Sequence, residues 1–147
     1  MYNILSVSLI LFLSTSLFSC TSSKEESPSV SNASLTNTRW VLRVLNDKKI
    51  FTPEKGKEAY ITLSKDGNKA NGVGGCNNFF TTYILSGKDL SFGPVASTEM
   101  FCEGQMDTET AFFKAISNTK TYKISGNFLY LSDSSKVIAK LEAVFLN

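Results

Sequence analysis

The residues of this 147-residue chain that are best suited to chemistry gather in one glycine-rich segment, residues 72–80, with the sequence GVGGCNNFF. Its cysteine, Cys76, could be a nucleophile or a redox thiol. Its glycines could expose backbone N–H groups to a phosphate. The segment could also be scaffold, because glycine permits sharp turns and close approach of another backbone. These three interpretations make different demands on the rest of the sequence.

The catalytic and ligand-binding interpretations lack the residues that they need. The chain has no histidine, which removes the usual general base for a nucleophile and a common zinc ligand. The glycines match neither a phosphate loop nor a dinucleotide fingerprint. Only Gly, Asn and Phe neighbour Cys76, whereas a reactive thiol requires an electropositive environment. The 13 acidic residues stand in no motif, so we expect no enzyme, no cofactor and no metal site.

The structural interpretation accounts for more of the segment. We expect a structural turn formed by Gly72, Gly74, Gly75 and Asn77, because glycine and asparagine tolerate left-handed backbone and asparagine bonds local backbone groups. The two phenylalanines that follow, at positions 79 and 80, would then return the chain to the core.

The N-terminus predicts export and a lipid anchor. Residues 1–19 are uncharged and largely apolar, as in a secretory signal peptide, although no Lys or Arg opens them. The run Leu17-Phe18-Ser19-Cys20 resembles the bacterial lipobox, in which the cysteine is lipidated and becomes the mature N-terminus. Acyl chains would anchor the protein, since each buried methylene contributes about 0.8 kcal/mol. The alternative is an ordinary cleaved signal or a single anchor helix.

Export also bears on the other two cysteines. With Cys20 acylated, Cys76 and Cys102 are the remaining thiols, and in an oxidising compartment they would most simply form a disulfide. A bridge closing a loop of about 25 residues contributes roughly 3 kcal/mol. The competing hypothesis is an enzyme that uses the two thiols as a redox couple.

Residues 20–34 predict a flexible tether. They are rich in serine and poor in large apolar residues, so they bury too little surface to offset their ordering entropy. Lys24-Glu25-Glu26 within them resembles a short surface-export signal of some Gram-negative lipoproteins, or is a solvated charge cluster. The net charge of the whole chain is only +2, with both signs scattered, so we expect no nucleic-acid partner.

Residues 35–147 predict one small domain. Period-two patterning recurs in short segments separated by the turn signals KDGN, SGKD, GN and DSSK; these segments are residues 40–45, 59–64, 69–75, 80–85, 90–95, 121–125, 128–132 and 137–145. Residues 105–118 have helical spacing, with Met106, Phe113 and Ile116 on one face and Glu109 interrupting it. The predicted fold class is α+β, mainly β: a small antiparallel, barrel-like curled sheet with one amphipathic helix.

The combination of motifs resembles the META/HslJ domain family over about residues 36–146. The resemblance rests on Gly-Cys-Asn at 75–77, on Ser-Thr-x-Met-x-Cys at 97–102 and on single positions elsewhere; these are Trp40, Leu42, Gly72, Phe80, Tyr83, Glu109, Phe113, Leu129 and Leu131. It implies a barrel-like sheet with one helix, akin to the pilot lipoproteins of secretion systems. It implies no catalytic residue, and it carries over only the cysteine pair and the glycine-asparagine turn, as structure.

The family is described as small envelope lipoproteins of bacteria, with members linked to heat shock, antibiotic tolerance, secretion or motility. We therefore expect an outer-membrane lipoprotein, periplasmic or surface-exposed, that binds an unknown partner in envelope stress or outer-membrane maintenance. The alternative function is a pilot or chaperone that binds an acyl chain or a hydrophobic peptide. Eleven phenylalanines would suit a cavity for such a ligand, but they would equally fill an ordinary core.

Overall fold

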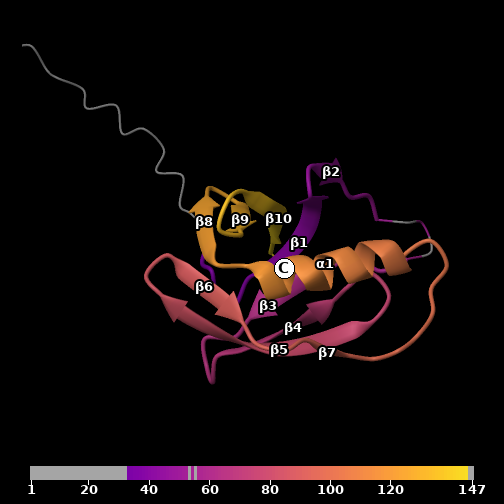
Figure 1. Cartoon of the computed structure of the whole chain (residues 1–147), viewed down its shortest axis with the longest axis horizontal. Helices are drawn as coiled ribbons and strands as arrows, with labels where there is room; N and C mark the ends of the chain where they lie inside the picture. Colours follow the sequence, from indigo (N-terminus) through magenta and orange to yellow (C-terminus); the bar gives the residue numbers. More distant parts are fainter. Residues whose placement is uncertain (1–32, 53, 55, 146–147) are drawn as a thin grey trace, which may run out of the picture.

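The computed structural model describes residues 33–145, except 53 and 55, so the predicted signal peptide, Cys20 and most of the tether lie outside the described residues. Within the described part the chain forms ten strands and one helix (Figure 1). In order these are β1 Arg39–Leu45, β2 Lys48–Lys49, β3 Tyr60–Leu63, β4 Lys69–Val73, β5 Asn78–Ser86, β6 Asp89–Phe92, β7 Ala96–Ser97, α1 Met106–Asn118, β8 Thr121–Ser125, β9 Phe128–Ser132 and β10 Val137–Val144.

Eight of the strands close into an antiparallel barrel, which confirms the predicted fold class. The order around the barrel is β1, β3, β4, β5, β6, β8, β9 and β10, and β10 pairs with β1 to complete the ring. The short strands β2 and β7, which the patterning did not predict, add to β1 and β5. The weakest junction lies between β6 and β8, where Asp89 and Thr121 form the one registered pair.

The predicted turns join the strands at the expected places. Ser64 donates its backbone N–H to the carbonyl of Lys69, and the positive φ angles fall at Gly67 and Asn68, one residue later than the Asp-Gly pair suggests. Gly87 and Gly126, at φ 60° and 58°, turn the chain between β5 and β6 and between β8 and β9. Glycine adopts this left-handed backbone without a steric penalty.

The alternation predicted for β1 fails at a bulge. The register to β10 slips between Leu42 and Val44, so the side chains after the bulge exchange faces. As a result Leu45 is buried, and Val44, expected on the same face as Trp40 and Leu42, is only half-buried.

Side chains fill the interior of the barrel. The fully buried residues include Trp40, whose indole N–H donates to the carbonyl of Leu35 at 3.0 Å. Helix α1 contacts β1, β6, β9 and β10, strands from around the ring, and so caps one end of the barrel. Its Phe112 and Ile116 are completely buried, and the Phe112 ring meets the edge of Phe79 from β5. Trp40, Phe79 and Phe112 thus pack inside the barrel as ordinary core, and the alternative of an acyl chain inside it loses its main support.

Candidate functional site

A disulfide joins the glycine-rich segment to the loop that precedes α1. Cys76, in the bend between β4 and β5, is bonded to Cys102 in the loop of residues 98–105, with 5.8 Å between their Cα atoms. The predicted pairing is therefore present in the structure. Cys76 is buried and its sulfur is held in the bridge, so the oxidised protein offers no nucleophilic thiol at this position.

The carboxylate of Glu109 organises the bend from inside the protein. Its residue is 4% exposed, and its Oε2 accepts the backbone N–H groups of Cys76 at 3.1 Å and Asn77 at 2.6 Å. Its Oε1 accepts the side-chain amide of Asn77 at 2.7 Å. Hydrogen bonds to an ionised acceptor are among the stronger ones in proteins, so this single side chain fixes the bend against helix α1.

The side chain of Asn77 in turn connects the bend to the loop of residues 98–105 by hydrogen bonds. Its Oδ1 accepts the backbone N–H of Met100 at 2.7 Å and the hydroxyl of Thr98 at 2.8 Å. Its Nδ2 also donates to the carbonyl of Met100 at 2.9 Å. The amide therefore makes the two donor and two acceptor contacts available to it, and it holds both backbone groups of Met100.

The glycines around Cys76 serve two purposes, which narrows the predicted turn of Gly72, Gly74, Gly75 and Asn77. Gly72 lies inside β4, where a Cβ would collide with the carbonyl oxygen of Tyr60 in β3. A Cβ on Gly74 would meet the Glu109 side chain at 2.6 Å and the Phe113 ring at 2.8 Å. Gly75, at φ 126°, is the residue whose backbone makes the turn. Two of the three thus make room for neighbours.

The expectations for Asn77 and for helix α1 also change. Asn77 has no left-handed backbone; it acts through its side-chain hydrogen bonds. Glu109 does not interrupt the buried face of α1 but belongs to it, together with Phe112, Ala115 and Ile116. Sequence reasoning missed this role. The available signal was an acidic residue at the helical spacing of a buried stripe, which implies a partner inside the protein.

The loop presents two large apolar side chains to solvent. Met100 is 55% exposed and Phe101 is 82% exposed. Between them and helix α1 lies a groove of about 410 Å³, lined also by Met106, Thr110 and Phe113 and, more deeply, by Asn77 and Glu109. We call this feature the loop groove. Its volume falls within the range of ligand sites.

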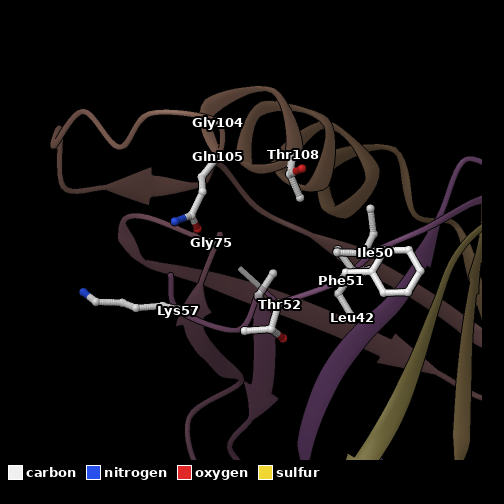
Figure 2. A pocket seen from close by; sticks show the side chains of 10 residues that line it. Leu42, Ile50, Phe51, Thr52, Lys57, Gly75, Gly104, Gln105 and Thr108 are labelled. Atoms are coloured by element: carbon white, nitrogen blue, oxygen red, sulfur yellow. The ribbon is translucent and has the colours of Figure 1, made fainter. Parts of the chain in front are cut away.

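A smaller cavity lies on the other side of the N-terminal end of α1 (Figure 2). It measures about 70 Å³, and its lining includes Gly75, Gly104, Gln105 and Thr108. Figure 2 shows the Gln105 side chain pointing toward Gly75, whereas the amine of Lys57 points away. Ligand pockets usually enclose about 300 Å³ or more, so this cavity is suited to a water molecule or two.

A third hollow covers the outer face of β4 and β5. It encloses about 620 Å³ and is lined by apolar Phe80, Pro94 and Ala96 beside polar Lys69, Asn71 and Thr82. Phe80 is 66% exposed, which corrects the expectation that both phenylalanines after the glycines enter the core; only Phe79 does. Thr81 is the buried polar residue that lines this hollow. Its hydroxyl donates to the carbonyl of Gly93, so it is already hydrogen-bonded within the protein.

Shifted titrations do not mark a catalytic site. The pKa of Arg43 is raised chiefly by its side-chain hydrogen bond to Glu142, at 2.7 Å, with Glu58 adding to it. The pKa of the Asp133 carboxyl is lowered by the backbone N–H groups of Ser135 and Lys136. Both belong to surface hydrogen-bond networks away from the loop groove. The described residues contain no group of three metal-ligating side chains.

Comparison with known proteins gives a family and a fold. The family model described as META domain matches residues 33–144. An NMR structure of a protein from Burkholderia xenovorans aligns with a TM-score of 0.63 and 24% identity, covering 76% of this chain and 85% of that one. A second NMR structure aligns at 0.57 and 20% identity, covering 71% and 87%. At such identities the likeness shows the fold alone, and no curated protein matches the chain. Among the described residues, no helix has the length and apolar character needed to span a bilayer.

Proposed function

The chain belongs to the META domain family, and on that premise we propose that it is a non-enzymatic, lipid-anchored binding protein of the bacterial cell envelope. In this proposal Cys20 carries the lipid, residues 20–34 are the tether, and the barrel domain binds a partner during envelope stress or outer-membrane maintenance. None of the comparisons points to an enzyme family, and the disulfide Cys76–Cys102 suits an oxidising compartment outside the cytoplasm.

One observation carries the binding role: two solvent-exposed apolar side chains lie on a loop that is held in place by covalent and hydrogen bonds. Large exposed apolar residues are unremarkable when scattered singly. Here Met100 and Phe101 are neighbours on a loop that is fixed by a disulfide at Cys102 and by three hydrogen bonds between Asn77 and the backbone and side chain of residues 98–100. Rigid presentation lowers the entropy that binding would otherwise lose, so the loop is suited to contact a partner.

A pilot or chaperone remains the second candidate function, but its ligand would bind on the outside of the barrel instead of inside it. Because Trp40, Phe112 and Ile116 occupy the interior, a hydrophobic ligand would bind in an outer groove. The hollow over β4 and β5, with exposed Phe80 and Pro94, supports that version. Native mass spectrometry of protein purified from membranes, in which a Phe80→Ser variant loses a co-purified lipid, would favour it over the loop groove.

The binding role is tested in cells that produce the full chain. A photo-crosslinking residue is placed at Phe101 and, as a matched control, at Ile84, which is 71% exposed on β5 but lies outside the loop groove. We expect one defined protein adduct from position 101 and none at the same mass from position 84. Equal, diffuse labelling from both positions would contradict the proposal.

The anchor is tested separately. Cells are labelled with radioactive palmitate, and incorporation is compared between the wild-type chain and Cys20→Ala. We expect the substitution to abolish labelling and to release the domain from the membrane fraction, because a lipidated cysteine is the proposed attachment. Labelling that persists in Cys20→Ala would refute the anchor without bearing on the loop.

A further inference from the structure

We propose that the loop groove binds an extended or helical peptide segment of a protein partner, in which an apolar side chain is flanked by lysine or arginine. This inference rests on the proposed binding function and adds the chemistry of the partner. It is drawn from the exposed side chains of Met100 and Phe101, from the groove beside them and from the sign of the charges around both.

The apolar side chain of the partner segment is inferred from the apolar residues that line the groove. Met100 and Phe101 form one wall of the groove, and Met106 and Phe113 of α1 also line it. Methionine and phenylalanine suit a side-chain pocket, because methionine adapts its shape and aromatic rings bury a large area. A single Leu, Phe or Trp of a peptide would cover the exposed ring of Phe101 and enter between loop and helix.

The charge of the partner follows from two acidic residues beside the groove, Glu99 and Glu103, which we call the rim. Glu99 lines the groove, and Glu103 follows two residues after Phe101 on the same loop. Both are exposed, and neither forms an ion pair with another residue that the structure describes. Between Lys88 and Lys114 the chain carries no lysine or arginine at all. No lysine or arginine is among the residues that line the groove, so its charged side chains are acidic and a cationic segment would be steered to it.

The same charges argue against a lipid surface as the occupant of this groove. Bacterial and other biological membranes expose anionic headgroups, and peripheral proteins reach them with basic residues. The unpaired carboxylates of Glu99 and Glu103 beside Phe101 would be repelled there, whereas the same carboxylates would attract a basic peptide. A protein segment is the partner that satisfies both the apolar wall and the acidic rim.

The test uses the oxidised protein and three probes: a short fluorescent peptide with two tryptophans flanked by lysines, the same peptide with glutamates in place of the lysines, and phosphatidylglycerol vesicles. Anisotropy and co-sedimentation are measured for the wild type, for Phe101→Ser and for the rim variant Glu99→Gln/Glu103→Gln. Ile84→Ser matches the loss of an exposed apolar side chain, and Asp66→Asn/Asp89→Asn matches the change in net charge at exposed aspartates elsewhere.

We expect saturable binding of the lysine peptide alone. Phe101→Ser should weaken it by about tenfold or more, as loss of an interface anchor does. The rim variant should slow association and remove most of its dependence on salt between about 50 and 500 mM. The two control variants should bind as the wild type does, and retained unfolding midpoints verify that every variant is folded.

Several results would overturn the inference. These are absence of saturable binding by the lysine peptide, equal binding of the glutamate peptide, no effect of Phe101→Ser, equal effects of the rim and control charge variants, or vesicle binding that depends on Phe101. In cells, an adduct from position 101 to a partner segment without basic residues would refute the inference while leaving the binding function intact. Absence of any adduct would refute both.

Discussion

Glu109 and Asn77, 32 positions apart in the chain, are joined by two short hydrogen bonds through which the helix fixes the bend of the disulfide. The Asn77 backbone N–H reaches Oε2 at 2.6 Å and its side-chain amide reaches Oε1 at 2.7 Å. The remaining amide contacts of Asn77 reach Thr98 and Met100. The position of the exposed loop thus depends on one buried carboxylate in α1.

Removing that carboxylate should destabilise the domain. Glu109→Ala leaves three buried donors without their acceptor, and we expect a loss of about 3 kcal/mol in the free energy of unfolding. Glu109→Gln should lose less, because one amide oxygen can still accept. Urea unfolding followed by fluorescence of Trp40 measures both. Glu103→Ala, an exposed carboxylate of the same loop, should change stability by less than about 0.5 kcal/mol; an equal loss there would contradict the assigned role.

The disulfide should account for a comparable share of stability. Reduction of the wild type is expected to lower the free energy of unfolding by roughly 3 kcal/mol, because it releases a closed loop in the unfolded chain. Cys76→Ala/Cys102→Ala should show the lowered value with and without reductant. Titration of thiols in the unfolded, unreduced mature protein gives an independent check. Finding both Cys76 and Cys102 free in it would contradict the bridge.

Gly72 should be among the least replaceable residues of the fold. A methyl group there points into the carbonyl oxygen of Tyr60 on the neighbouring strand, so Gly72→Ala must push β3 and β4 apart and should lose about 3 kcal/mol or fail to fold. Gly87→Ala meets no atom within 4 Å and bears only the strain of φ 60°, about 1 kcal/mol. Thermal melts of the two variants separate crowding from backbone strain, and similar losses would show that crowding is unimportant.

The phenylalanines should fall into two classes. Phe101→Ser removes an exposed side chain and is expected to change stability by less than about 0.5 kcal/mol. Phe112→Ala empties a completely buried position and should lose about 3–5 kcal/mol. Guanidinium unfolding of both proteins gives the comparison. A large loss of unfolding free energy in Phe101→Ser would mean that the ring packs against the domain and is not free to contact a partner.

Ionised Asp133 should contribute measurably to the free energy of unfolding, and this contribution should be lost in acid. Its folded pKa lies below the ordinary 3.8, because the backbone N–H groups of Ser135 and Lys136 and the Ser135 hydroxyl bind the ionised form. The stabilisation is therefore fully present above the unfolded value and is lost as pH falls through the folded one. NMR titration of the carboxyl carbon measures the folded pKa. Asp133→Asn should flatten stability against pH in that acidic range, whereas Asp66→Asn, which removes the same charge elsewhere, serves as the control.

Local rules were enough to predict most of the barrel. Asp66-Gly67, Gly87 and Gly126 predicted hairpin turns because few residues accept their backbone angles, and alternation placed the strands between them. The failures are those of long-range geometry. The bulge after Leu42 and the two-residue strands β2 and β7 depend on which backbone lies alongside, information that a local pattern does not contain.

The candidate site was predictable in its covalent part only. Cys76 and Cys102 were identified from cysteine number and the predicted compartment. Glu109 was read as an interruption of an apolar stripe, because its acceptor role becomes visible only once the bend of β4 and β5 lies against α1. Likewise, nothing local to Phe80 or Phe101 says which phenylalanine faces solvent.

Closure of the barrel through β1 and β10 sets the order in which the domain can be made. Arg43 and Glu142 bond across this junction from positions 99 residues apart, and the first and last strands of the described domain are neighbours. Because such non-local pairing comes late and slowly, a nascent chain that emerges N-terminus first holds an open sheet edge on β1 until its final strand arrives. Shortening the C-terminus by one strand should therefore yield an aggregation-prone protein instead of a smaller stable one.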